Sequence, residues 1–295
     1  MEKREIAKSE LVLTDDKRIY HLHLKPEEIA DTILLVGDPG RVKLISSYFD
    51  IVETVVENRE FVTHTGVLNG KHLSAVSTGI GTDNIDIVIN ELDALANIDL
   101  DTRMVKTETR KLRFIRMGTS GALHAEIEPG NVIVAQVAGG LDNLMYFYDG
   151  IERINDQELT DSFVSYMNWK PGNSKPYFIP VSPSLLALID RPEYFKGITL
   201  AAPGFYAPQG RSLRLAIHDT NYVDKISAFR SGDLRINNFE MEGSALYGLS
   251  RHLGHDALTV CIALANRITG KFATDYQPYI KKLIENILER VTGDE

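Results

Sequence analysis

Three short apolar runs of the chain each lead into a glycine-rich segment, and this arrangement limits the possible folds more than any other feature. The segments are Gly37-Asp-Pro-Gly40, Ser77-Thr-Gly-Ile-Gly81 and Gly118-Thr-Ser-Gly121. A short apolar run bounded by glycine or proline is typical of a buried strand that ends in a turn, so we expect three turns here. Because ligands of open α/β sheets gather at the carboxyl ends of the strands, these turns predict a binding site.

Apolar periodicity predicts helices and further strands around these segments. Strands are expected at 32–36, 131–138, 198–202 and 257–264, and a hairpin at 61–76 that turns at Asn69-Gly70. Apolar residues recur at helical spacing over 85–92, 242–252 and 276–291, and Asp83 is placed to cap the first of these helices. The alternation predicts an α/β fold, namely a three-layer α/β/α sandwich with a central mixed, largely parallel sheet.

The length and patterning predict one domain over residues 1–295. A charged stretch at about 99–111 is typical of a solvated insertion. Weaker patterning at about 151–197 predicts a longer peripheral region of helices and loops.

Charge and composition exclude several classes of protein. The formal net charge of −9 argues against nucleic-acid binding, which usually requires a basic surface, so an anionic ligand would need a locally positive pocket. No stretch approaches the roughly 18 apolar residues of a membrane span, and the charged residues 1–8 are not followed by the apolar core of a secretion signal. The single cysteine, Cys261, suits a reducing compartment, so we expect a cytoplasmic protein without a membrane partner.

The glycine-rich segments and nearby arginines could together form an anion site. Glycine lets backbone N–H groups approach an anion, and the guanidinium groups of Arg41 and Arg116 match phosphate oxygens. Each segment taken alone is more often only a tight turn. The segment Gly79-Ile-Gly81 also resembles part of a dinucleotide fingerprint, but Asn84 stands where the third glycine is required, which counts against a nicotinamide-dependent dehydrogenase.

Two later segments carry residue types suited to a nucleoside. Phe205, Gln209 and Arg211 offer an aromatic face, an amide and a guanidinium for a flat heterocycle, although this segment taken alone is more often a surface loop with a chance aromatic. Carboxylates at 240 and 242 open a predicted helix, where they could bind sugar hydroxyls or merely complement the helix dipole. His21 and His23 lack a third ligand, so no metal site is expected there.

Seven ordered motifs resemble the nucleoside phosphorylase family that includes purine and uridine phosphorylases, and the match runs from about His21 to Arg267. The motifs are Val36-Gly-Asp-Pro-Gly-Arg41, Arg59-Glu-Phe61, Ser77-Thr-Gly-Ile-Gly81, Phe114-Ile-Arg-Met-Gly-Thr-Ser-Gly121, Phe205-Tyr-Ala-Pro-Gln-Gly-Arg211, Phe239-Glu-Met-Glu242 and Asn266-Arg-Ile-Thr269. Their order and mutual fit make the resemblance specific, and the uridine branch is the nearest. The Gln209-x-Arg211 pattern resembles that family's pyrimidine-selective signature.

The resemblance implies a role for each matching residue. Phosphate would be held by Gly37, Arg41, Arg116 and Thr119, with Arg59 from a neighbouring subunit. The base would be held by Phe205, Gln209 and Arg211, and the ribose by Glu240, Met241 and Glu242 with His21 of the neighbour. Arg116, Arg211 and Gln209 would be the catalytic residues.

The resemblance also implies a homo-oligomer with shared sites, a hexamer built as a trimer of dimers. No cofactor is required, but a structural potassium ion is implied beside Glu60, Ile80 and Asn84, although Asn84 stands where relatives carry a small hydroxyl residue. The family's purine branch protonates its leaving base with an aspartate before the last Asn-Arg pair, and residues 261–266 contain none.

The expected reaction is therefore reversible phosphorolysis, in which uridine and inorganic phosphate give uracil and ribose 1-phosphate in pyrimidine salvage. A nucleosidase that uses water, a purine nucleoside phosphorylase and a non-catalytic nucleoside-binding protein remain as alternatives. Arg41 and Arg116 count against the nucleosidase, because hydrolysis needs no anion site.

Overall fold

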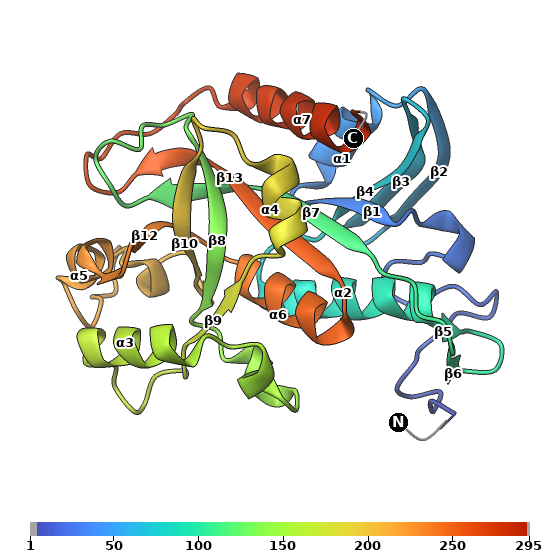
Figure 1. The fold of residues 1–295 in the computed structure, drawn as a ribbon, viewed down its shortest axis with the longest axis horizontal. Helices are drawn as coiled ribbons and strands as arrows, with labels where there is room; N and C mark the ends of the chain where they lie inside the picture. Colours follow the sequence, from blue (N-terminus) through green and yellow to red (C-terminus); the bar gives the residue numbers. More distant parts are fainter. Residues whose placement is uncertain (1–4, 294–295) are drawn as a thin grey trace.

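The centre of the molecule is a large β-sheet, and the computed structural model describes residues 5–293 (Figure 1). Within these residues, eleven strands form the sheet in the order β11-β12-β10-β8-β13-β7-β1-β4-β3-β2, with β9 paired to β8. The strands are β1 (Thr32–Val36), β2 (Ile51–Asn58), β3 (Phe61–Leu68), β4 (Lys71–Ser77), β7 (Arg113–Ala122), β8 (Val132–Gly140), β9 (Tyr177–Pro180), β10 (Phe195–Ala201), β11 (Arg230–Ser231), β12 (Leu234–Glu240) and β13 (Asp256–Asn266). The sheet is mixed, as predicted.

Helices cover both faces of this sheet. They are α1 (Pro39–Ser46), α2 (Thr82–Asn97), α3 (Gln157–Met167), α4 (Pro183–Ile189), α5 (Tyr222–Ala228), α6 (Gly243–Leu253) and α7 (Gln277–Thr292). Helices α1 and α7 lie together on one side, where Tyr48 after α1 donates to Glu285 of α7, and α2 packs against α6 on the other side (Figure 1). The predicted three-layer arrangement is therefore confirmed.

Five strands of the sheet close into a ring, which the sequence did not predict. Strand β12 pairs with β10 on one side, and Asn238 and Phe239 of β12 pair with Ala122 and Gly121 of β7 on the other. Together with the β7–β13, β13–β8 and β8–β10 pairings, this contact completes what we call the strand ring. Its closure brings the end of β7 against the end of β12.

The segment 118–121 is not a turn, and this prediction was wrong. All four residues belong to β7, which runs from Arg113 to Ala122. A Cβ at Gly118 would collide with Nη1 of Arg116, and one at Gly121 would come within 3.4–3.6 Å of the Arg267 and Arg211 side chains. These two glycines leave room for guanidinium groups beside an extended strand.

The other two glycine segments do end strands. Strand β1 ends at Val36, and α1 begins at Pro39 with Asp38 as its N-cap, accepting a hydrogen bond of 2.9 Å from the Gly40 amide. Gly81, with a φ of 99°, caps α2 in place of the predicted Asp83, which instead lies in the first turn. Because the backbone is left-handed at this position, glycine is favoured there.

The peripheral regions contain more structure than their patterning indicated. Residues 98–105 form a small hairpin of β5 (Ile98–Asp99) and β6 (Met104–Val105) inside the mostly exposed stretch 99–111. The guanidinium of Arg103 anchors it by donating to carbonyls of residues 6, 7 and 11. Strand β9 lies within the region expected to hold only helices and loops, and β2 was not predicted at all.

Candidate functional site

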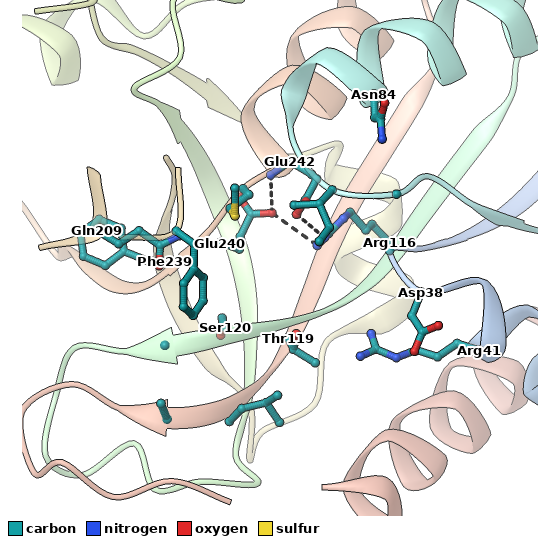
Figure 2. A pocket seen from close by; sticks show the side chains of 18 of the residues that line it. Asp38, Arg41, Asn84, Arg116, Thr119, Ser120, Gln209, Phe239, Glu240 and Glu242 are labelled. Atoms are coloured by element: carbon teal, nitrogen blue, oxygen red, sulfur yellow. Dashed lines mark hydrogen bonds and ion pairs between the residues drawn. The ribbon is translucent and has the colours of Figure 1, made fainter. Parts of the chain in front are cut away.

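A cavity of about 860 Å³ opens at the carboxyl ends of β1, β4, β7 and β12 (Figure 2). Its walls bring together predicted site residues from six separate segments of the chain, namely Gly37, Arg41, Glu60, Ile80, Asn84, Arg116, Thr119, Phe205, Gln209, Arg211, Glu240, Met241 and Glu242. Its position is the usual ligand position in α/β sheets, and its volume suits a small ligand.

The buried wall of the cavity is built around Arg116, whose side chain is 4% exposed. Its Nη2 donates to a carboxylate oxygen of Glu242, and its Nη1 lies 3.3 Å from Oε2 of Glu240 (Figure 2). Glu242 also accepts a bond of 2.8 Å from the backbone N–H of Gly81, and Glu240 accepts bonds of 2.9–3.0 Å from Gly243 at the start of α6. The closed strand ring therefore supplies both sides of one compact charge cluster.

The charges in this cluster shift the pKa values of Arg116 and Glu240. Burial alone would lower the pKa of Arg116, but the charges of Glu242 and Glu240 outweigh it and raise that pKa, so the guanidinium stays charged. Burial raises the pKa of Glu240 to about 7, against the opposing effect of Arg116 and with support from Glu242. Glu240 can thus change its charge near neutral pH.

Arg116 still has unused hydrogen-bond donors. Its Nε and Nη1 are buried and make no hydrogen bond to any residue in 5–293, although Nη1 also lies in the ion pair with Glu240. Buried donors of this kind are normally satisfied by a ligand or by water. They lie beside the cavity and suit an anion there.

Arg41 brings a second positive charge to the same cavity. It lies in the first turn of α1, and Figure 2 shows its guanidinium in the space beside Thr119. Burial lowers the pKa of Arg41, Asp38 opposes this shift, and repulsion from Arg116 adds to it. Because an anion would relieve that repulsion, the pair favours a ligand such as phosphate.

The opposite wall is a loop that carries Gln209 and Arg211. Gln209 is 2% exposed, and its Oε1 accepts a bond of 2.6 Å from Nη1 of Arg211. The Arg211 guanidinium lies 3.8 Å from the centre of the Phe205 ring and also donates to the Phe205 carbonyl. Burial, and then repulsion from Arg267, lower the pKa of Arg211 to about 10.

Two predicted residues do not line the cavity of this single chain. Arg59 is exposed, with a φ of 55°, and its guanidinium lies 5.5 Å from the centre of the Tyr20 ring. Nδ1 of His21 lies 2.6 Å from Oε1 of Glu91. Both residues had been assigned to the site of a neighbouring subunit.

Arg267 was missed as a site residue, although the motif at 266–269 contains it. Its Nη1 donates to the Gln209 carbonyl over 2.8 Å and thereby holds the loop against β13. The only sequence signal was an arginine directly after a buried strand, and its partner is 58 positions away.

One end of the site thus has guanidinium groups that suit an anion, and the other end has an amide and a guanidinium that suit a flat polar ring. These features are typical of a protein that binds either a nucleotide or a nucleoside together with phosphate. Residues 31–290 match the family described as the Phosphorylase superfamily, and the chain belongs to that family.

Individual relatives agree with this assignment. Uridine phosphorylase of Thermococcus kodakarensis is 34% identical over 266 residues, which cover 88% of this chain and 81% of the relative. A purine nucleoside phosphorylase of Listeria welshimeri is 28% identical and covers 85% and 88% of the two chains. The crystal structure of a Trypanosoma brucei nucleoside phosphorylase, described as showing uridine phosphorylase activity, superposes with a TM-score of 0.87 at 28% identity, covering 96% of this chain and all of that one.

Proposed function

We propose that this chain is a pentosyltransferase that catalyses the reversible phosphorolysis of uridine to uracil and ribose 1-phosphate in pyrimidine salvage. The observation that carries the proposal is the presence of Arg41 and the buried Arg116 on one wall of the cavity and of Gln209 and Arg211 on the other. Relatives named uridine phosphorylase support it.

In this proposal, phosphate is held by Gly37, Arg41, Arg116 and Thr119. The C1′–N1 bond lengthens first, its electron pair moves into the uracil ring, and a phosphate oxygen then bonds to C1′. Held beneath C1′, the phosphate is both positioned and electrostatically stabilised, so no protein nucleophile is needed.

The loop that carries Gln209 and Arg211 stabilises the negative charge that develops on the leaving uracil. The Gln209 amide nitrogen has no partner within residues 5–293 and can donate to a carbonyl oxygen of the base. Arg211 supplies positive charge beside it, while Phe205 packs on the ring. Met241 packs on the ribose, and Glu242 and Glu240 accept hydrogen bonds from its hydroxyl groups.

The alternatives fit less well. A nucleosidase would not need Arg41 and Arg116 side by side in one buried cavity. A purine phosphorylase is supported by some relatives, but residues 261–266 at the end of β13 provide no carboxylate to protonate a leaving purine. A non-catalytic binding protein would have no use for the phosphate arginines.

A homo-oligomer completes the proposed site. Arg59 and His21 lie outside the cavity of their own chain, and the exposed apolar side chains Ile51, Val52 and Val55 on β2 offer a surface for a second copy. We place both residues in the neighbour's site, within a hexamer arranged as a trimer of dimers. Light scattering that finds only monomers would contradict this assembly.

No cofactor is needed for this chemistry, and a potassium ion would be structural. Glu60, Ile80 and Asn84 all line the cavity, and they carry a carboxylate, a backbone carbonyl and a side-chain amide, whose oxygen atoms suit a hard cation. If activity were unchanged when potassium is replaced by a bulky organic cation, the ion would play no part. No helix within residues 5–293 is long and apolar enough to cross a membrane, and the buried Cys261 suits the cytoplasm that we propose.

One assay tests the reaction. Uracil release from uridine is measured with and without inorganic phosphate, and inosine serves as the matched purine substrate. We expect release only with phosphate and only from uridine. Release without phosphate would favour the nucleosidase, faster turnover of inosine would favour the purine enzyme, and binding without turnover would favour the binding protein.

A further inference from the structure

A second cavity lies at the amino ends of central strands of the sheet, whereas the candidate active site lies at their carboxyl ends. Its volume is about 470 Å³, and Thr32, Lys71 and Arg113 stand on its wall at the beginnings of β1, β4 and β7. These three strands pair in parallel and in register, with Thr32 opposite Leu73 and Arg113. Their other ends lead to the active-site cavity, so the length of the strands separates the two cavities.

Positive charge is concentrated in this second cavity. Besides Lys71 and Arg113, its wall carries Arg191, which follows α4, and Arg290 near the end of α7. Glu289 is the acidic residue of the wall, and its carboxylate pairs with Nη2 of Arg191 over 2.6 Å. Among the described residues that line the cavity, four cations thus face one carboxylate, in a chain whose formal net charge is −9. The excess creates a local field that attracts anions.

Most of these cations form no ion pair or side-chain hydrogen bond with the other described residues. Among residues 5–293, the side chains of Lys71, Arg113 and Arg290 have no ion-pair or hydrogen-bond partner. The Nε atoms of Arg113 and Arg191 are buried and without a hydrogen-bond partner in the same residues. Because an unsatisfied buried donor on a charged group is costly, these atoms indicate an external acceptor.

We propose that this basic cavity binds the diphosphate group of a small molecule, at a site separate from the phosphorolysis reaction. A single phosphate would leave the four cations with an excess of positive charge, whereas a diphosphate balances them more closely and offers enough oxygens for two guanidinium groups. The volume exceeds that of a diphosphate alone, and Leu73, Leu188 and Val291 on the wall provide apolar contact for an attached nucleoside.

Calorimetry with inorganic pyrophosphate and, separately, with uridine diphosphate tests this proposal in phosphate-free buffer. The full chain is used. We expect a site in the basic cavity whose affinity falls at least tenfold in the double variant Lys71→Gln/Arg290→Gln, because charge-assisted contacts are lost. Both substituted residues are exposed, so folding should be unaffected. Tighter binding of uridine diphosphate would identify a nucleotide, and equal binding would identify the diphosphate group alone.

Two controls separate this site from the active site and from general electrostatics. Lys282→Gln removes an exposed cation from the same helix α7 outside the cavity and should leave the affinity unchanged. Arg41→Gln removes the proposed phosphate arginine and should also leave it unchanged. No binding of either probe, unchanged binding in the double variant, loss of all binding in Arg41→Gln, or an equal loss in Lys282→Gln would each overturn the proposal. None of these outcomes depends on phosphorolysis.

Discussion

The two walls of the active-site cavity are built in different ways. The wall around Arg116 comes from strands of the closed ring, is almost fully buried, and balances its positive charge with two carboxylates. The wall around Arg211 is a loop in which the guanidinium is only partly buried, packs on the half-exposed Phe205 ring and has an amide as its side-chain partner. We infer that the proposed phosphate end is fixed before a ligand arrives, whereas the base end can readjust around the ligand.

Replacing Arg116 should produce the largest effect, because it disrupts the fixed wall. Arg116→Ala removes the charge that both carboxylates face, and we expect phosphate-dependent kcat/KM to fall by roughly a thousandfold. The unpaired buried carboxylates should also lower the free energy of unfolding by about 3 kcal/mol. Steady-state kinetics and chemical denaturation measure the two effects.

Arg41→Ala is the matched control for this variant, since Arg41 has no carboxylate bonded to it among residues 5–293. It should raise KM for phosphate with little change in stability. Near-normal phosphate-dependent turnover by Arg116→Ala would refute the proposed phosphate site.

A change on the loop wall should have a smaller and more selective effect. Gln209→Leu leaves the carbonyl of the base without a donor and removes one of the two acceptors of Arg211 Nη1, so kcat/KM for uridine should fall by roughly a hundredfold. The unfolding midpoint should change little, because Arg211 keeps its bond to the Phe205 carbonyl. A large loss of stability with unchanged kcat/KM would show that Gln209 stabilises the loop and does not hydrogen-bond to the base.

The smallest expected effect is a pH dependence that only the fixed wall should show. The pKa of Glu240, raised by burial to about 7, means that its carboxyl loses its proton as the pH rises through neutrality. The new negative charge competes with phosphate for Arg116, so KM for phosphate should rise a few-fold between pH 6 and 8.

Glu240→Gln provides the reference, because phosphate titrates identically in both proteins and only the ratio of their KM values is compared. A folded pKa above the ordinary value of 4.5 contributes stability below pH 4.5 that is lost as pH rises through 7. The wild type should therefore lose stability relative to Glu240→Gln as the pH rises from about 4.5 to 7, and the difference should level off above that pH. A constant KM ratio would show that Glu240 keeps one charge state throughout.

The sequence predicted those parts of the fold that depend on local patterning. The apolar runs gave β1, β8, β10 and β13, and helical spacing gave α2, α6 and α7. The hairpin of β3 and β4 turns at Asn69-Gly70, where both residues have positive φ, as the dipeptide predicted. Strand β2 has an exposed pattern with little apolar contrast, and so it gave no such signal.

Features that depend on distant pairing could not be predicted. Closely spaced glycines such as Gly118 and Gly121 are typical of a turn. Here they leave space for neighbouring side chains, most of which come from distant parts of the sequence. The Arg116 cluster likewise requires Glu242, and nothing local marks a carboxylate as the partner of an arginine so far away. Motif resemblance placed these residues in one site, but only the structure showed that Arg116 is already paired.

The closure of the strand ring also has a consequence for how the protein folds. Arg116 and Glu242 are 126 positions apart, and the pairing of β7 with β12 that brings them together cannot form until most of the chain has been made. Contacts of such long range form slowly, because a large loop must close first. A nascent or partly folded chain would therefore have buried strands and helices yet no anion site, and ligand binding would report completed folding.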